Sequence, residues 1–178
     1  MSERAASPSP VGGRMRRLLP FGVVAALVAL VFAGYLRAMT AGAGGLAFPL
    51  AFPLDDAYIH LQYARAVGEG HPFRYQAADA PTSGGTSLLY PFLLGAFYGG
   101  DSTGQTLINA ALTVNLLSWL SAAFSLYALI ASSRYGHYPL VGLIGAGAFA
   151  AHGALGWAFM SGMESGLFIA SIFATLWA

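Results

Sequence analysis

Cysteine and lysine are absent from this chain of 178 residues, and charged residues of any kind make up only 8% of it. Without cysteine, the chain can form neither a disulfide nor a thiolate metal site. Soluble domains are about one quarter charged, so the shortage of charge beside 57% hydrophobic residues indicates a membrane protein. The net charge of +1, with no basic patch beyond the N-terminus, argues against a nucleic-acid partner.

Long apolar segments follow a head, residues 1–17, that is rich in Ser and Pro and is expected to be disordered. Residues 18–39, 106–131 and 140–160 are each long enough to cross about 30 Å of hydrocarbon. Residues 164–178 are apolar but form an incomplete span, because a spanning helix needs about 20 residues. The first segment is predicted to be a signal anchor rather than a cleaved signal peptide, since its apolar core exceeds the usual length of about 7–15 residues.

The arginines predict the orientation of these spans. Several precede the first span, and Arg134 lies in the short link between the second and third. The positive-inside rule places both regions on the cytoplasmic side, which makes the loop of residues 40–105 and the turn near Glu164 extracytoplasmic. Arginine without lysine, together with abundant Ala and Gly, points to a GC-rich bacterial genome and hence to the bacterial cytoplasmic (inner) membrane.

The expected fold class is all-α: a polytopic transmembrane helical bundle with interfacial helices in a long first extracytoplasmic loop. Residues 54–67 show a helical apolar stripe that is too narrow for full immersion in lipid. Residues 87–98 are apolar but too short to span, so they predict a second interfacial helix. Within the third span, Gly142, Ala146 and Ala150 recur every four residues and predict a close packing face.

Two neighbouring carboxylates, Asp55 and Asp56, come at the predicted start of the first loop helix, although the chain has only seven acidic residues. One interpretation is a helix cap, with Asp55 as the capping residue, which would contribute about 1 kcal/mol. The other is a reactive pair at the membrane surface. A single Asp, Ser or Thr would be enough for a cap, so the pair favours a reaction.

Three segments carry a resemblance to a known superfamily: "DDAYIHLQYARAVGEGHPFRY", "TSGGTSLLYPFLL" and "SGMESGLF". In this order they resemble the N-terminal part of the polytopic GT-C glycosyltransferases, in particular the bacterial branch similar to protein mannosyltransferases and lipid-linked arabinofuranosyltransferases. The resemblance covers residues 18–178. Members of the superfamily have more spans, so this chain is expected to be an incomplete portion whose activity alone is in doubt.

The resemblance implies an enzyme that transfers a sugar from a polyprenyl-phosphate donor to a glycan, protein or lipid acceptor on the outer face of the membrane. In the superfamily the acidic motif of the first loop serves the acceptor, and here it falls on Asp55 and Asp56. We expect Asp55 to act as the general base and Asp56 to orient it or to ligate a metal weakly. No cofactor is expected, and whether the reaction uses a divalent cation is left open.

Other candidate substrate-binding residues are Glu164, His60, His71, Arg74 and Tyr58. Glu164 resembles the acid at the start of the superfamily's fourth span, but it is equally compatible with a helix N-cap. The two histidines and Arg74 are loop groups able to meet a phosphate or a sugar. His60 also lies one turn from Asp56, so a surface pair between them is the alternative. The ring of Tyr58 is able to stack on a sugar.

Two other classes of protein share these features. One is a non-enzymatic polytopic membrane protein, such as a transporter segment or scaffold, in which the loop helix only anchors the spans. The other is a subunit that binds or flips a lipid-linked sugar and needs no base. The charges lie in the loop and at the ends of spans rather than near the bilayer midplane, which favours chemistry at the surface.

Overall fold

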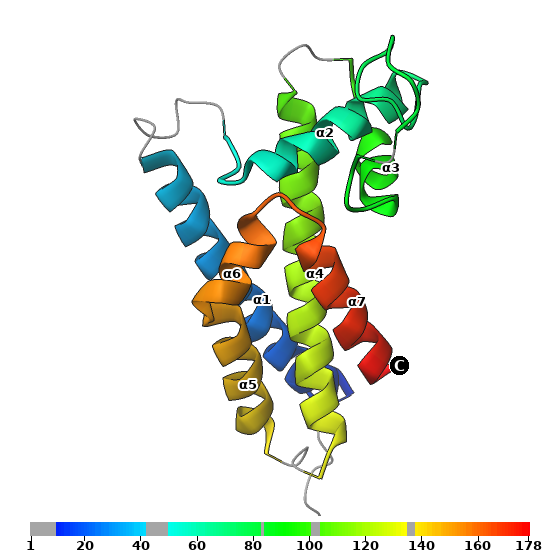
Figure 1. Cartoon of the computed structure of the whole chain (residues 1–178). Coiled ribbons are helices and arrows are strands. Elements are labelled where there is room, and N and C mark those ends of the chain that lie inside the picture. Colours follow the sequence, from blue (N-terminus) through cyan, green and yellow to red (C-terminus); the bar gives the residue numbers. More distant parts are fainter. Residues whose placement is uncertain (1–9, 42–49, 83, 101–103, 135–137) are drawn as a thin grey trace, which may run out of the picture.

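The computed structural model describes the whole chain except residues 1–9, 42–49, 83, 101–103 and 135–137. The regular elements of the described part are all α-helices, which confirms the all-α prediction (Figure 1). They are α1 (Pro10–Ala41), α2 (Asp55–Gly68), α3 (Leu89–Gly95), α4 (Gln105–Ser132), α5 (Pro139–Ala151), α6 (Gly153–Met160) and α7 (Ser165–Trp177). Both α5 and α7 pack against α4, and α2 crosses the upper part of α4 in this view.

Two helical segments are long and apolar enough to cross a membrane, Leu18–Thr40 within α1 and Gln105–Ser132, which is α4. They match the predicted spans at residues 18–39 and 106–131. The helix α1 begins earlier than predicted, at Pro10, so residues 10–17 are helical rather than part of an irregular head. Proline is well suited to the first position of a helix, where its missing N–H costs no hydrogen bond. Residues 1–9 of that head lie outside the described residues.

The third predicted span, residues 140–160, is not one straight helix. The helices α5 and α6 meet at an angle of 60°, and only as a bent pair are they long enough to cross a membrane. His152 interrupts the helix because its backbone is extended, with ψ of 117°. The hydroxyl of Tyr35 in α1 donates a hydrogen bond of 2.9 Å to the carbonyl of Gly153, the first residue after the break. The partner comes from another helix, so the apolar run alone does not predict the bend.

The small residues of α5 form a packing face, as predicted. Gly142, Ala146 and Ala150 are all buried. A Cβ atom on Gly142 would lie 2.9 Å from the ring of Tyr127 in α4, so the two helices approach as closely as glycine allows. Such contact through small residues is the usual way in which helices associate in lipid, where apolar burial alone gives little driving force.

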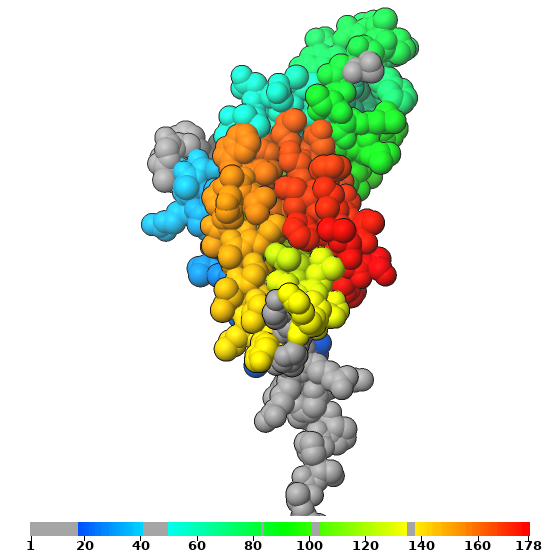
Figure 2. All heavy atoms as spheres, turned by 60° about the horizontal axis from the view of Figure 1, so that its bottom comes forward, coloured from blue at the N-terminus to red at the C-terminus, as the bar shows by residue number. Residues whose placement is uncertain are grey.

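The last apolar segment, residues 164–178, forms α7, whose 13 residues are shorter than a membrane span. It packs against α4 along one side and leaves Phe168, Ile172 and Leu176 exposed at helical spacing. Figure 2 shows the red atoms of α7 adjoining green atoms of the first loop on one face of the molecule. The beginning of α7 therefore lies beside the loop that carries the acidic pair.

The first loop contains two helices, as predicted, but with different lengths. The helix α2 matches the prediction for residues 54–67 within one residue at each end. The helix α3 is shorter than the predicted residues 87–98, because the chain leaves the helix after Gly95 through tight turns such as Phe97 N–H to Leu94 O at 2.9 Å. A Cβ atom on Gly95 would lie 2.8 Å from the carbonyl oxygen of Ala64, so α3 packs almost directly on the backbone of α2.

Candidate functional site

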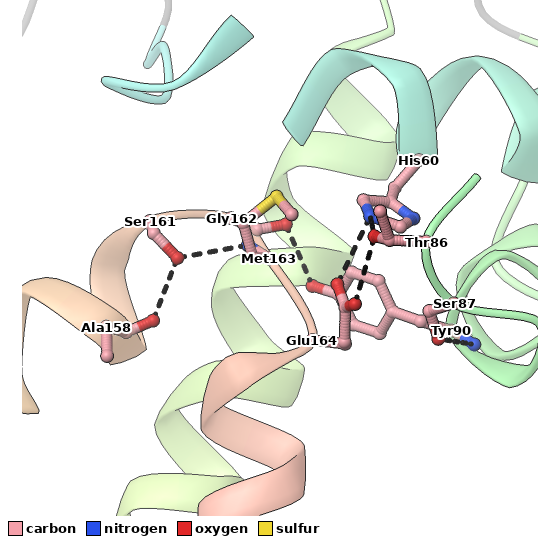
Figure 3. Close-up of polar contacts among 9 residues, drawn as sticks. All are labelled: His60, Thr86, Ser87, Tyr90, Ala158, Ser161, Gly162, Met163 and Glu164. Carbon is pink, nitrogen blue, oxygen red and sulfur yellow. Dashed lines mark hydrogen bonds and ion pairs between the residues drawn. The ribbon is translucent and has the colours of Figure 1, made fainter. Parts of the chain in front are cut away.

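A buried histidine joins the first loop to the start of α7. His60 is 1% exposed, and its Nε2 atom lies 3.1 Å from Thr86 Oγ1 and 3.1 Å from Glu164 Oε2 (Figure 3). The Thr86 hydroxyl donates in turn to Glu164 Oε1 at 3.2 Å. A hydroxyl that donates to the carboxylate must accept from the ring, so His60 carries its hydrogen on Nε2. These three residues form what we name the loop–helix cluster.

Glu164 occupies the N-cap position of α7, but its side chain makes no capping hydrogen bond. The carboxylate turns to His60 and Thr86 instead, so the capping interpretation of this side chain is wrong. A tight turn before it sets this direction, with Gly162 at φ of +81°, a conformation that suits glycine. A Cβ atom there would also lie 2.5 Å from the ring of Phe52, which precedes α2. Backbone and packing thus both require glycine at the turn.

Tyr90 packs against the loop–helix cluster. Its side chain is fully buried, its hydroxyl donates to the carbonyl of Gly162 at 3.3 Å, and its ring stacks edge-on against His60. Burial raises the pKa of the Tyr90 hydroxyl above its ordinary range, and the nearby Glu164 carboxylate raises it further, while Asn115 opposes both. Tyr90 is therefore a neutral hydrogen-bond donor at physiological pH.

The predicted catalytic pair lies in the first turn of α2. Asp55 and Asp56 are both exposed, and neither carboxylate has a hydrogen-bond or ion-pair partner among the described residues. The N-cap is Leu54, in extended conformation and without a side-chain capping bond, so Asp55 is not the cap. Carboxylates in the first turn still interact favourably with the helix dipole. The structure thus leaves both acids open to solvent.

His60 does not form a surface pair with Asp56. Its ring is buried and points toward Glu164 (Figure 3). Asp56, in contrast, is exposed. The two residues remain one turn apart on α2, where side chains at this spacing have Cβ atoms roughly 5–6 Å apart. The acidic pair is therefore close to the loop–helix cluster.

The remaining candidates make local contacts in the described part of the chain. The Tyr58 hydroxyl accepts a hydrogen bond from Phe52 N–H at 2.9 Å and ties the start of α2 to the preceding segment. The ring of His71 lies 3.3 Å from Glu69, and Arg74 donates to the carbonyl of Ala77 at 3.1 Å. The structure does not join these three side chains to the loop–helix cluster.

Thr86 and Tyr90 are not among the site residues predicted from the sequence, although the structure places both against His60. No spacing in the sequence signals either contact, because His60, Thr86 and Glu164 come from three separate segments. Within the described residues, no group of three or more His, Cys, Asp or Glu side chains is placed to hold a metal ion.

Two hollows lie next to the cluster. One, of about 220 Å³, lies between α2, α3 and the residues before α3, and its wall includes Tyr63, Phe73 and Thr86. The other, of about 660 Å³, lies between the start of α3 and the first turns of α7 and includes Thr86 and Glu164. No family model, curated protein or solved structure matches this chain.

Proposed function

We propose that this chain belongs to a membrane glycosyltransferase that moves a sugar from a polyprenyl-phosphate donor to an acceptor hydroxyl, with Asp55 as general base. The observation that carries the proposal is the placement of Asp55 and Asp56. Both are exposed and free of partners in the described structure, at the end of long apolar helices and one turn from the loop–helix cluster. The resemblance of the three sequence segments to the GT-C glycosyltransferases supports the same assignment.

The chemistry needs few groups. A hydroxyl is a poor nucleophile, and a carboxylate within hydrogen-bond reach takes its proton as the bond to the anomeric carbon forms. The polyprenyl phosphate leaves as an anion, so no general acid is required on the other side of the bond. One base and a single inverting displacement complete the transfer, unlike glycoside hydrolysis, which uses two carboxyl groups.

In this proposal the loop–helix cluster is a support for the acidic pair. His60 anchors the second turn of α2 to Glu164 and Thr86 by contacts of 3.1 Å. Because Asp56 lies one turn away, this anchor fixes where the carboxylates stand relative to α7. A base must be held within hydrogen-bond reach of its substrate, and a misplacement of about 1 Å lowers the rate as much as 100-fold.

The proposed location is the bacterial inner membrane, with the acidic pair on the extracytoplasmic side and the N-terminus in the cytoplasm. The two long apolar helices supply the membrane part. The arginine distribution supplies the orientation. At that surface a polyprenyl-linked sugar has its tail in the bilayer and its head at the level of the loop helices, which is where a carboxylate base would meet it.

The alternative is a non-enzymatic membrane protein, either a transporter segment or a subunit that binds or flips a lipid-linked sugar. It shares the apolar helices and accounts for the cluster as a purely structural anchor. It gives no reason for two adjacent, exposed carboxylates that have no partner among the described residues, which is why we favour the enzyme.

The test is transfer from a radiolabelled polyprenyl-phosphate sugar by membranes that contain the full gene product. We expect turnover in the wild type, its loss in Asp55→Asn, and near-normal turnover in Glu69→Gln, a control that changes another exposed loop acid. Near-normal turnover in Asp55→Asn would exclude Asp55 as the general base. Binding of the donor without any transfer by the wild type would favour the binding or flipping subunit.

A further inference from the structure

The larger hollow has the size and the division of chemistry expected of a lipid site. Its volume of about 660 Å³ lies within the roughly 300–1,000 Å³ typical of small-molecule pockets, whereas the neighbouring hollow of about 220 Å³ lies below that range. Four of its eight lining residues are polar and four are apolar. The lining residues are Thr86, Ser87, Leu88, Leu89, Glu164, Ser165, Phe168 and Ile169.

The polar end of the hollow is formed around the Glu164 carboxylate, whose oxygen atoms accept hydrogen bonds. The Glu164 side chain is 27% exposed, and its Oε2 atom is buried beside His60. Its Oε1 atom accepts one hydrogen bond from Thr86 at 3.2 Å, and a carboxylate oxygen has lone pairs for a second one. Ser87 and Ser165 add hydroxyl groups to the same lining. This set is suited to a ligand that carries several O–H donors.

The other side of the hollow is a surface for an apolar chain. Leu88, Leu89 and Phe168 are 64%, 76% and 65% exposed, and together they form an apolar surface of the kind that meets lipid or a partner. The surface continues along α7 through Ile172 and Leu176, which follow Phe168 at intervals of four residues on the same helical face. A hydrocarbon tail would therefore run down α7 while its head stays at Glu164.

The charge of the lining discriminates between head groups. Among the lining residues Glu164 is the one charged side chain, and the nearest titratable group behind it is His60, which already faces the carboxylate. A phosphate placed at this end would meet a like charge in a partly desolvated position. A neutral sugar head would instead donate hydrogen bonds to the carboxylate, and hydrogen bonds to ionised acceptors are the stronger kind.

From these contacts we infer that the hollow between α3 and α7 binds the sugar head of a neutral glycolipid, and that Glu164 accepts hydrogen bonds from its hydroxyls. The inference rests on the proposed function in one respect, since such a lipid would be the acceptor in the transfer. It assigns to this hollow the neutral acceptor and not the phosphate-bearing donor. The acceptor class is then a membrane-anchored glycan rather than a soluble protein.

The experiment is photolabelling of the full chain in lipid nanodiscs. One probe is decyl β-glucoside with a diazirine in the tail, and the other is decyl phosphate with the same tail. Mass spectrometry locates the label. We expect the glucoside to label residues 86–89 and 165–169, and the phosphate to label them much less.

Glu164→Gln should reduce glucoside labelling about five-fold, as expected from the loss of one charge-assisted hydrogen bond. Because this change also disturbs the contact with His60, Phe168→Ser provides a second variant at a side chain that is 65% exposed and not required for packing. It should reduce labelling by both probes. Leu140→Ser, at a residue of α5 that is 68% exposed, is its matched control and should change neither.

Equal labelling by both probes would show apolar partition without head-group recognition and would overturn the inference. Loss of glucoside labelling in the presence of excess polyprenyl-phosphate sugar would assign the hollow to the donor and overturn it too. The outcome is separable from the proposed function, because labelling needs no turnover and should persist in Asp55→Asn. Labelling without transfer refutes only the enzyme, and Asp55-dependent transfer without labelling refutes only the glycolipid site.

Discussion

The Nε2 atom of His60 lies 3.1 Å from Oε2 of Glu164, which ties the second turn of α2 to the residue that precedes α7. His60 is buried, and Glu164 is only partly exposed. The contact therefore lies at the boundary between the buried interior and the exposed surface of the molecule. It places the one charged side chain of the larger hollow next to the helix that carries Asp55 and Asp56.

The contact between His60 and Glu164 should contribute measurably to stability. In a double-mutant cycle with His60→Ala and Glu164→Gln, we expect a coupling energy of about 1 kcal/mol, because one partner is buried and the other partly desolvated. Thermal unfolding of the detergent-purified chain measures it. The exposed pair Arg65 and Glu69 is the control and should couple more weakly. A coupling energy near zero for His60 and Glu164 would mean that the contact does not hold α2 in place.

The two acids of α2 should differ in their effect on transfer. Consecutive helical residues point about 100° apart, so only one of the two carboxylates aims squarely at a given acceptor. Asp55→Asn should lower the rate by about 10²–10⁴, the usual contribution of a general base. Asp56→Asn should leave measurable turnover and mainly raise the apparent KM. Rate constants and KM values from a radiolabelled donor assay decide this, and the reverse order of effects would move the base to Asp56.

The close approach of α3 to α2 should make Gly95 intolerant of a side chain. In Gly95→Ala the new Cβ would lie 2.8 Å from the backbone oxygen of Ala64, so the two helices must separate, at a cost of about 1–3 kcal/mol. Gly22→Ala in α1 is the matched control, since no atom lies within 4 Å of the added Cβ. Denaturation midpoints of both variants test this. An unchanged midpoint for Gly95→Ala would contradict the packing.

The hydrogen bonds among Arg65, Glu69 and Tyr98 should stabilise the fold near neutral pH and should be lost at both low and high pH. Hydrogen bonds from Arg65 and Tyr98 lower the pKa of Glu69, so its contribution is present above the ordinary carboxyl pKa and disappears as the pH falls through the lowered value. The hydrogen bond to Glu69 raises the pKa of Tyr98. The stabilisation that the Tyr98 hydroxyl contributes therefore disappears only as the pH rises through this raised pKa.

Tyr98→Phe removes this hydrogen bond and provides the test. The difference in Tm between wild type and Tyr98→Phe should be largest near neutral pH and should vanish well below the ordinary carboxyl range, about pH 4. A difference that stays constant from neutral to acid pH would mean that the Tyr98 hydroxyl contributes through packing and not through the carboxylate of Glu69.

The predicted orientation is testable because the chain has no native cysteine. Single cysteines at Ser2→Cys and Ala78→Cys report the two sides of the membrane. An impermeant maleimide should label Ala78→Cys in intact cells, because the position is exposed in the first loop, and should label Ser2→Cys only after the cells are opened. Labelling of Ser2→Cys from outside would reverse the orientation.

The sequence alone determined the helical class, two helices long and apolar enough to cross a membrane, and the position of α2. Those features depend on the length of apolar runs and on helical periodicity, which are local properties of the chain. The first two spans, residues 18–39 and 106–131, therefore agree with the structure to within a few residues, apart from the earlier start of α1 at Pro10. The packing face at Gly142 was predictable for the same reason, since its spacing lies within one helix.

Only the tertiary structure decided the bend at His152 and the contacts of His60. At the bend the hydroxyl of Tyr35, from another helix, bonds the carbonyl of Gly153, and the direction of Glu164 depends on a turn held by Gly162 against Phe52. The sequence predicts a surface pair for a histidine one turn from an aspartate, because the spacing of four residues can be seen in the sequence. A partner from a distant segment, such as Glu164, cannot be seen there. The burial of His60 follows from its contacts with Thr86, Tyr90 and Glu164, which come from distant segments and have no local signature.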